Sequence, residues 1–88
     1  MVERSVQVIN RNGLHARPAA LFVKVASRYD ADVYVEKDGT KVSGKSILGL
    51  MTLEASCGSA LRVSASGRDA QRVLDELEQL VLRKFDET

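Results

Sequence analysis

The sequence predicts an α+β fold, an open-faced βαββαβα sandwich in which three helices cover one face of a four-stranded antiparallel sheet. Segments with alternating apolar residues are interleaved with segments whose apolar residues recur at helical spacing. An Asp-Gly pair between two strand-like segments indicates a hairpin. The helical segments are long enough to cover only one face of the sheet. With 88 residues, the chain is expected to form one domain over residues 1–88 with a thin core.

The first half of the chain contains three predicted strands and one helix. A strand is expected over residues 2–9, where valines share one side, and a turn over residues 10–13. A helix then begins at Ala16, and its small apolar stripe would let it approach the sheet closely. A second strand is expected over residues 31–36, and Asp38-Gly39 is typical of a type I′ turn into a third strand over residues 40–43. The residues of the helical stripe are Ala16, Ala19, Ala20, Val23 and Ala26.

The second half contains two predicted helices and the last strand. Ser46 is a suitable N-cap for a short helix that ends near Leu53. This helix has too many apolar side chains for one narrow stripe, so some of them should be exposed. A fourth strand is expected over residues 61–66. Asp69 should then cap a last helix, whose apolar side chains recur at helical spacing as far as Phe85.

Composition argues against several classes of protein. Thirteen Lys and Arg are balanced by twelve Asp and Glu, with two Tyr, two Phe and no Trp, so the chain lacks the basic and aromatic surface of a nucleic-acid-binding protein. No apolar run approaches the roughly 20 residues that span a bilayer, so no membrane association is expected. The lone Cys57 and the absence of a secretory signal pattern indicate the cytoplasm. One histidine and one cysteine are too few ligands for a zinc site, and we expect no metal and no cofactor.

Residues 12–20, N-G-L-H-A-R-P-A-A, contain the only histidine, His15, and the only proline, Pro18. His15 falls next to the predicted helix N-terminus, where the first backbone N–H groups lack intrahelical acceptors and the helix dipole is positive. Pro18 is tolerated in the first turn because an N–H there would have no partner within the helix. Together with the permanent charge of Arg17, these features suit an anion such as phosphate. We therefore expect His15 to carry or bind a phosphoryl group.

Other interpretations of the sequence remain open. A lone histidine is commonly a surface or capping residue, so an inert interaction domain is one alternative. Residues 39–46, G-T-K-V-S-G-K-S, match the letters of a Walker A motif and would predict a nucleotide site that includes Lys45. The context disfavours this second alternative. A P-loop follows a buried parallel strand and precedes a long helix, whereas Gly39 lies in the predicted hairpin.

The short helix contains two further candidates. Ser46 is either a plain cap or a phosphorylation site, since a phosphate at a helix N-terminus gains from the dipole while it adds about two negative charges. Ile47, Leu48 and Met51 are either core residues or a patch that faces a partner.

The motif G-L-H-A-R-P-A-A, together with G-K-S-I-L-G-L-M and S-A-S-G-R-D, resembles HPr, the family of histidine-containing phosphocarriers of the bacterial phosphoenolpyruvate-dependent sugar phosphotransferase system. The resemblance covers essentially the whole chain. It implies a carrier protein, not an enzyme, in which His15 accepts a phosphoryl group on Nδ1 from phosphorylated enzyme I and passes it to the IIA component of a sugar permease. Arg17 would stabilise the phosphoryl oxygens, with Ala16 and Pro18 beside it in the phosphate-binding turn.

The resemblance also implies docking partners and regulation. Ile47, Leu48 and Met51 match the apolar patch that docks enzyme I and IIA. Ser46 matches the serine that HPr kinase/phosphorylase modifies, which adds that kinase and a catabolite-control regulator to the expected partners. We expect a monomer that binds its partners transiently, because a carrier that binds tightly cannot shuttle.

His15 bears on which branch of the family the chain resembles, because it argues against the catabolite-repression paralogue, which lacks this histidine. A nitrogen-related phosphocarrier with a regulatory output remains the alternative. The chain departs from the commoner family pattern after the short helix: Glu54 stands where glycine is frequent, and Cys57 is unusual there.

Overall fold

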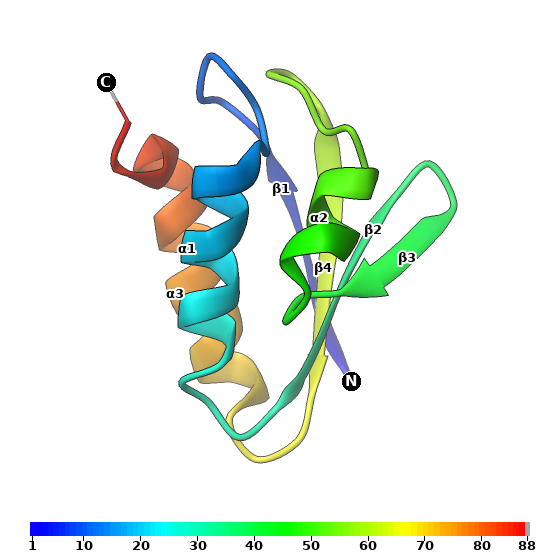
Figure 1. The fold of residues 1–88 in the computed structure, drawn as a ribbon. Helices are drawn as coiled ribbons and strands as arrows, with labels where there is room; N and C mark the ends of the chain where they lie inside the picture. The colour runs from blue at the N-terminus through cyan, green and yellow to red at the C-terminus, as the bar shows by residue number, and fades with distance from the viewer. Residues whose placement is uncertain (88) are drawn as a thin grey trace.

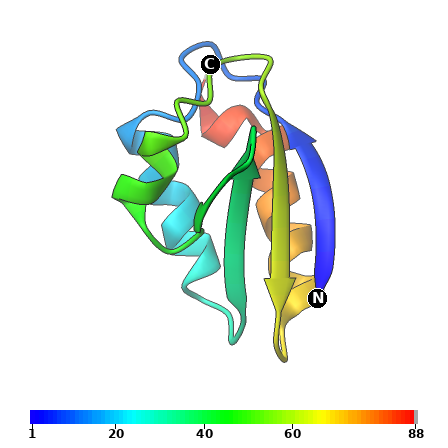
Figure 2. The same cartoon turned by 90° about the vertical axis from the view of Figure 1, so that its right-hand side faces the viewer.

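The computed structural model describes residues 1–87; the last residue of the predicted domain, Thr88, lies outside them. The strands within these residues form an antiparallel sheet in the order β1-β4-β2-β3, and the helices lie on one of its faces (Figures 1 and 2). This confirms the predicted open-faced sandwich. The elements are β1 (Val2–Gln7), α1 (Ala16–Ala26), β2 (Asp32–Lys37), β3 (Thr40–Ser43), α2 (Ile47–Thr52), β4 (Ala60–Ser66), α3 (Ala70–Leu82) and a short turn over Lys84–Asp86.

Strand β4 lies at the centre of the sheet and pairs with both β1 and β2. Val63 is opposite Val35 in β2, and both side chains are buried against the helices. The next pair along, Arg62 and Glu36, faces away from the helices and forms an ion pair of 3.6 Å. This alternation explains why the strands were predictable from their sequence pattern. The strand expected over residues 2–9 ends earlier than predicted, at Gln7.

The β2–β3 hairpin has the predicted turn. Asp38 and Gly39 have φ angles of 50° and 84°, and a type I′ turn requires positive φ at both central residues. Lys37 pairs with Thr40 across the turn. Residues 39–46 therefore form a hairpin turn, an edge strand and a short loop. This is not the geometry of a P-loop, which connects a buried parallel strand to a long helix.

Helix α1 packs on the sheet with a face that overlaps the predicted stripe but is shifted towards Phe22, which flanks that stripe. Phe22 and Val25 are buried, whereas Ala16 and Ala20 of the predicted stripe are exposed. The buried face is centred on the larger side chains because they remove more apolar area from water than alanine does. Ala19 and Ala26 of the predicted stripe are buried with them, and so is Pro18.

The start of α3 agrees with the prediction in position but not in contacts. Asp69 occupies the N-cap position, as predicted, but its side chain makes no capping hydrogen bond among the residues described. Instead, Asp69 Oδ2 accepts a hydrogen bond of 3.0 Å from the backbone N–H of Asp30, and the N–H of Asp69 donates to Asp30 O at 3.0 Å. The side chain therefore joins the loop before α3 to the loop before β2.

The end of α3 is the second departure. The helix ends at Leu82, and Phe85 lies beyond it with its side chain fully buried. Lys84, Phe85 and Asp86 have φ angles of 58°, 54° and 60°, which form a left-handed turn. Left-handed backbone costs about 1 to 2 kcal/mol per residue when the residue is not glycine. Burial of the Phe85 ring, worth about 2 to 3 kcal/mol, offsets part of this cost.

None of the helices in residues 1–87 is long and apolar enough to cross a bilayer.

Gly13 is the position where this fold most needs a glycine. Its φ is +69°, and an added Cβ would lie 2.4 Å from Ala55 O and 2.8 Å from the Cα of Ser56. We expect Gly13→Ala to lower the free energy of unfolding by about 3 kcal/mol, because strain and a backbone clash combine. Urea-induced unfolding measures this change.

Gly39→Ala is the matched control, since Gly39 has φ +84° but, apart from Gly39 and its two chain neighbours, no residue of 1–87 has an atom within 4 Å of its added Cβ. It should lose only about 1 kcal/mol, from strain alone. Equal losses in the two variants would show that the contact with Ala55 does not constrain the loop.

Candidate functional site

The predicted site residue His15 lies where three segments meet at one end of the sandwich. These segments, at the top of Figure 1, are the loop between β1 and α1, the loop between α2 and β4, and the turn that follows α3. The backbone N–H of Leu14 donates to Ala55 O at 2.8 Å, which joins the first two segments. The side chain of Asn10 donates to Glu87 Oε1 at 2.9 Å, which joins the first and third.

The loop before α1 is held in shape by the buried side chain of Asn10. Asn10 is only 1% exposed, and its Nδ2 also donates to Gly13 O at 2.8 Å. The N–H of Gly13 returns a hydrogen bond of 3.2 Å to Asn10 O. A turn closed at both ends in this way fixes the position from which His15 enters the helix.

His15 occupies the N-cap position of α1, as predicted. Its backbone is extended, and Ala19 N donates to His15 O at 3.0 Å in the first helical turn. The imidazole makes no capping hydrogen bond within residues 1–87, and its side chain is 40% exposed. The N–H groups of Ala16 and Arg17 have no acceptor inside the helix, and both residues are exposed. The positive end of α1 is therefore free to face an anion close to the imidazole.

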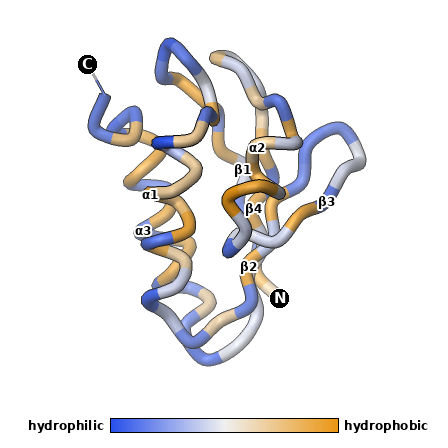
Figure 3. Tube along the Cα trace, viewed as in Figure 1, coloured by the Kyte–Doolittle hydropathy of each residue, from blue (hydrophilic) through white to orange (hydrophobic). Residues whose placement is uncertain are grey.

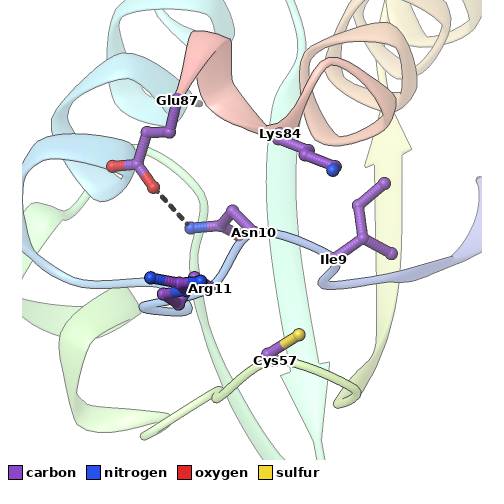
Figure 4. A pocket seen from close by; sticks show the side chains of 6 residues that line it. All are labelled: Ile9, Asn10, Arg11, Cys57, Lys84 and Glu87. Atoms are coloured by element: carbon purple, nitrogen blue, oxygen red, sulfur yellow. Dashed lines mark hydrogen bonds between the residues drawn. The ribbon is translucent and has the colours of Figure 1, made fainter.

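The structure adds a residue that the sequence did not indicate, Glu87. Its Oε2 lies 2.9 Å from His15 Nε2. Its Oε1 accepts the hydrogen bond from Asn10 Nδ2, which Figure 4 shows. The Glu87 side chain is 16% exposed, so this carboxylate is largely enclosed. No sequence motif links residues 72 positions apart, and the apolar spacing around Phe85 predicted a continued helix that would not turn towards the loop.

Hydrogen bonding keeps the carboxylate of Glu87 ionised. The bond from Asn10 lowers the pKa of Glu87, and the hydrogen bond and charge of His15 and the charge of Arg17 act in the same direction. Burial opposes them by raising the pKa, but the net pKa lies below that of an ordinary glutamate. A negative charge is thus held against one ring nitrogen of His15.

Two hollows flank this end of the molecule. One is lined by His15 together with Asn12, Leu14, Glu54, Ala55 and Ser56, and the other lies beside Glu87 and includes Arg11, Lys84 and the exposed Cys57 (Figure 4). Glu54 has a φ of 52°, a conformation that favours glycine and explains why a glycine would also suit this position. Within residues 1–87, no group of three His, Cys, Asp or Glu side chains is placed to hold a metal.

Helix α2 presents the predicted apolar patch. Ser46 Oγ accepts a hydrogen bond of 2.9 Å from Gly49 N, which confirms its role as N-cap. Leu50 is fully buried, whereas Ile47, Leu48 and Met51 are 42%, 75% and 40% exposed. Figure 3 shows this hydrophobic stretch on α2, which contacts α1. The expectation that some of these side chains are exposed is confirmed; what they bind remains a prediction.

Comparisons with known proteins extend over the whole chain. The family model for the PTS HPr component phosphorylation site matches residues 2–82. The phosphocarrier protein HPr of Treponema pallidum is 45% identical over 87 residues, which cover 99% of each chain. The HPr-like protein Crh of Bacillus subtilis is 49% identical over 81 residues, which cover 92% of this chain and 95% of the relative. The crystal structure of HPr-C-His from Thermoanaerobacter tengcongensis has a TM-score of 0.96 at 44% identity, covering 100% of this chain and 99% of that one.

We expect Glu87 to make stability depend on pH. Its pKa is lowered in the folded chain, so its stabilising contacts are complete above the pKa of an unfolded glutamate, about 4.3, and are lost as the pH falls through the lower folded value. The difference in unfolding free energy between the wild type and Glu87→Gln should therefore shrink as the pH falls below about 4. Urea-induced unfolding at a series of pH values measures it, with Glu3→Gln on the open face as the control for loss of one charge. A difference that does not change with pH would contradict the expectation.

Proposed function

This chain belongs to the PTS HPr family of phosphocarrier proteins, and on that premise we propose that it carries a phosphoryl group on His15 from phosphorylated enzyme I to IIA components of sugar permeases. The observation that most strongly supports this role is the position of His15, partly exposed at the N-cap of α1 with Arg17 beside it. A partly exposed imidazole suits a carrier, because two partner proteins must reach the same ring in turn.

The proposed transfer uses only groups of this chain and of its partner. A ring nitrogen of His15 attacks phosphorus; the new N–P bond forms as the bond between phosphorus and the donor breaks, and the electron pair of that bond leaves with the donor. The free N–H groups of Ala16 and Arg17 and the positive end of α1 stabilise the phosphoryl oxygens. The guanidinium of Arg17 adds a charge that is permanent at physiological pH. Pro18 fixes the backbone of this first turn.

The exposed side chains of Ile47, Leu48 and Met51 form the proposed docking patch for enzyme I and IIA. Their support is their exposure on a helix that contacts α1, the helix that begins at His15. Apolar side chains that protrude from a rigid helix bind without much loss of conformational freedom. We expect the partners to bind a monomer transiently in the cytoplasm, because a carrier must release each partner.

Ser46 is the proposed control point of the same surface. Phosphorylation by HPr kinase/phosphorylase would add about two negative charges at the N-cap of α2, directly before Ile47. Those charges gain from the helix N-terminus but disfavour apolar docking. The phosphoserine form is the one that a catabolite-control regulator would recognise.

Phosphorylation of His15 is tested with enzyme I and phosphoenolpyruvate. We expect an acid-labile phosphate on the wild-type chain, none on His15→Ala, and phosphorylation slowed by about 100-fold in Arg17→Ala, because a charged group that stabilises the transferring oxygens is lost. Mass spectrometry and rapid-quench assays measure the product and its rate. An unmodified wild-type mass, or label retained by His15→Ala, would remove this function.

Docking through α2 is tested by binding to enzyme I. Leu48→Ser should raise the Kd by about 10-fold without changing stability, because a 75% exposed side chain contributes to an interface and not to the core. Leu82→Ser on α3, 59% exposed in the wild type, is the control and should leave the Kd unchanged. Calorimetry gives both constants.

In the same assay, Ser46→Asp should also raise the Kd, because it places a charge at the edge of the docking patch. Wild-type affinity in both Leu48→Ser and Ser46→Asp would show that partners dock elsewhere.

A further inference from the structure

We propose that Glu87 is a positioning residue, which holds the imidazole of His15 through Nε2 and so makes Nδ1 the ring nitrogen that takes the phosphoryl group. The proposal rests on the proposed role of His15 as the phosphoryl carrier. In this proposal, the turn after α3 determines which of the two ring nitrogens of His15 is phosphorylated.

The geometry of the carboxylate supports this role. Each oxygen of Glu87 has its own partner: Oε1 accepts from Asn10 Nδ2 at 2.9 Å, and Oε2 lies 2.9 Å from His15 Nε2. Asn10 is itself fixed, since the same Nδ2 donates to Gly13 O at 2.8 Å and the residue is 1% exposed. Rotation of the carboxylate would break one of these contacts. Glu87 therefore restrains the orientation of the imidazole as well as contacting it.

The backbone of Lys84–Asp86, which positions Glu87, is held in place despite its unfavourable left-handed conformation. Lys84, Phe85 and Asp86 form the left-handed turn, and the N–H of Glu87 donates to Lys84 O at 3.0 Å. The fully buried ring of Phe85 anchors this turn. Three consecutive left-handed residues persist only where the surroundings determine the conformation, and such strain is concentrated at functional sites. The position of Glu87 is thus built into the fold.

The chemistry follows from which nitrogen is engaged. The ionised carboxylate accepts a hydrogen bond from Nε2–H, which keeps the proton on Nε2 and leaves the lone pair of the neutral ring on Nδ1. When Nδ1 attacks, the N–P bond forms, the donor's bond to phosphorus breaks and its electron pair leaves with the donor. The proton stays on Nε2, and the positive charge that develops on the ring lies against the carboxylate of Glu87. This is the role that the carboxylate has in a Ser-His-Asp triad. The same contact covers Nε2 and removes it as a competing nucleophile.

Phosphoramidate, a small phosphoryl donor, tests the proposal without any partner protein. His15 is the only histidine, so phosphorus-31 and nitrogen-15 NMR signals of phosphohistidine report on this ring alone. The wild type should form the Nδ1 isomer. Glu87→Ala should raise the ratio of the Nε2 to the Nδ1 isomer by about 10-fold, because the cover and the orientation are both lost. Asp86→Asn is the control and should keep the wild-type ratio, since Asp86 pairs with Arg83 and not with His15.

Glu87→Gln distinguishes two effects of Glu87: orientation of the imidazole by its negative charge, and steric covering of Nε2 by its side chain. Glutamine keeps the size of the side chain and an acceptor for Asn10, but its amide donates to Nε2 and favours the ring with the proton on Nδ1. The rate of phosphorylation should fall by about 10-fold, and the nitrogen-15 shifts should show the proton on Nδ1. This variant also keeps the turn folded if Glu87→Ala does not.

An unchanged isomer ratio in Glu87→Ala, or an unchanged rate in Glu87→Gln, would overturn the positioning role. Failure of enzyme I to phosphorylate the wild type would remove the carrier function instead. Because phosphoramidate needs no partner, the two failures are distinguishable.

Discussion

The buried side-chain amide of Asn10 is the interaction on which the site depends. One nitrogen donates to the loop before α1 at Gly13 O and to the C-terminal turn at Glu87 Oε1. A buried donor left without a partner costs about 1 to 3 kcal/mol, so the loop and the turn are held in one arrangement. The contact of Gly13 and Leu14 with Ala55 adds the third segment. Hydrogen bonds thereby join three loops at the end of the sheet that holds His15.

The site is a partly exposed ring on a rigid end of the sandwich, and this form suits its proposed chemistry. The sheet and the buried faces of α1 and α3 provide the stability, while the reacting group lies in a loop, as functional residues commonly do. In an enzyme, one pocket would supply all the groups that stabilise the reaction; here this chain and its partner protein each supply some of them. This chain provides the helix N-terminus, Arg17 and the oriented imidazole, and each partner would complete the site from outside. The exposed Leu48 of the proposed docking patch lies on α2, whereas the His15 imidazole lies at the start of α1, so the proposed docking patch and the reacting ring are on separate helices.

What could be predicted from the sequence was encoded over short distances along the chain. Alternating apolar residues predicted the strands, and Asp38-Gly39 predicted the hairpin. The residues around His15 predicted where α1 begins. The interactions that were missed depend on packing between distant segments. The buried face of α1 is shifted from the alanines towards Phe22, and the side chain of Asp69, at the N-cap position of α3, bonds to Asp30 instead of the helix. Glu87 reaches His15 only because the chain turns at Phe85. No local pattern reports such contacts.

The left-handed turn after α3 has a practical consequence for labelling. It places the side chain of Glu87 beside the imidazole, whereas Met1 lies at the opposite end of β1 with 75% of its surface exposed (Figure 1). A purification tag or fluorophore fused to the C-terminal segment would therefore be joined close in sequence to a residue that contacts the ring, and it could hinder binding proteins there. The same group attached at Met1 would report on binding from the far end of the sheet without disturbing the histidine.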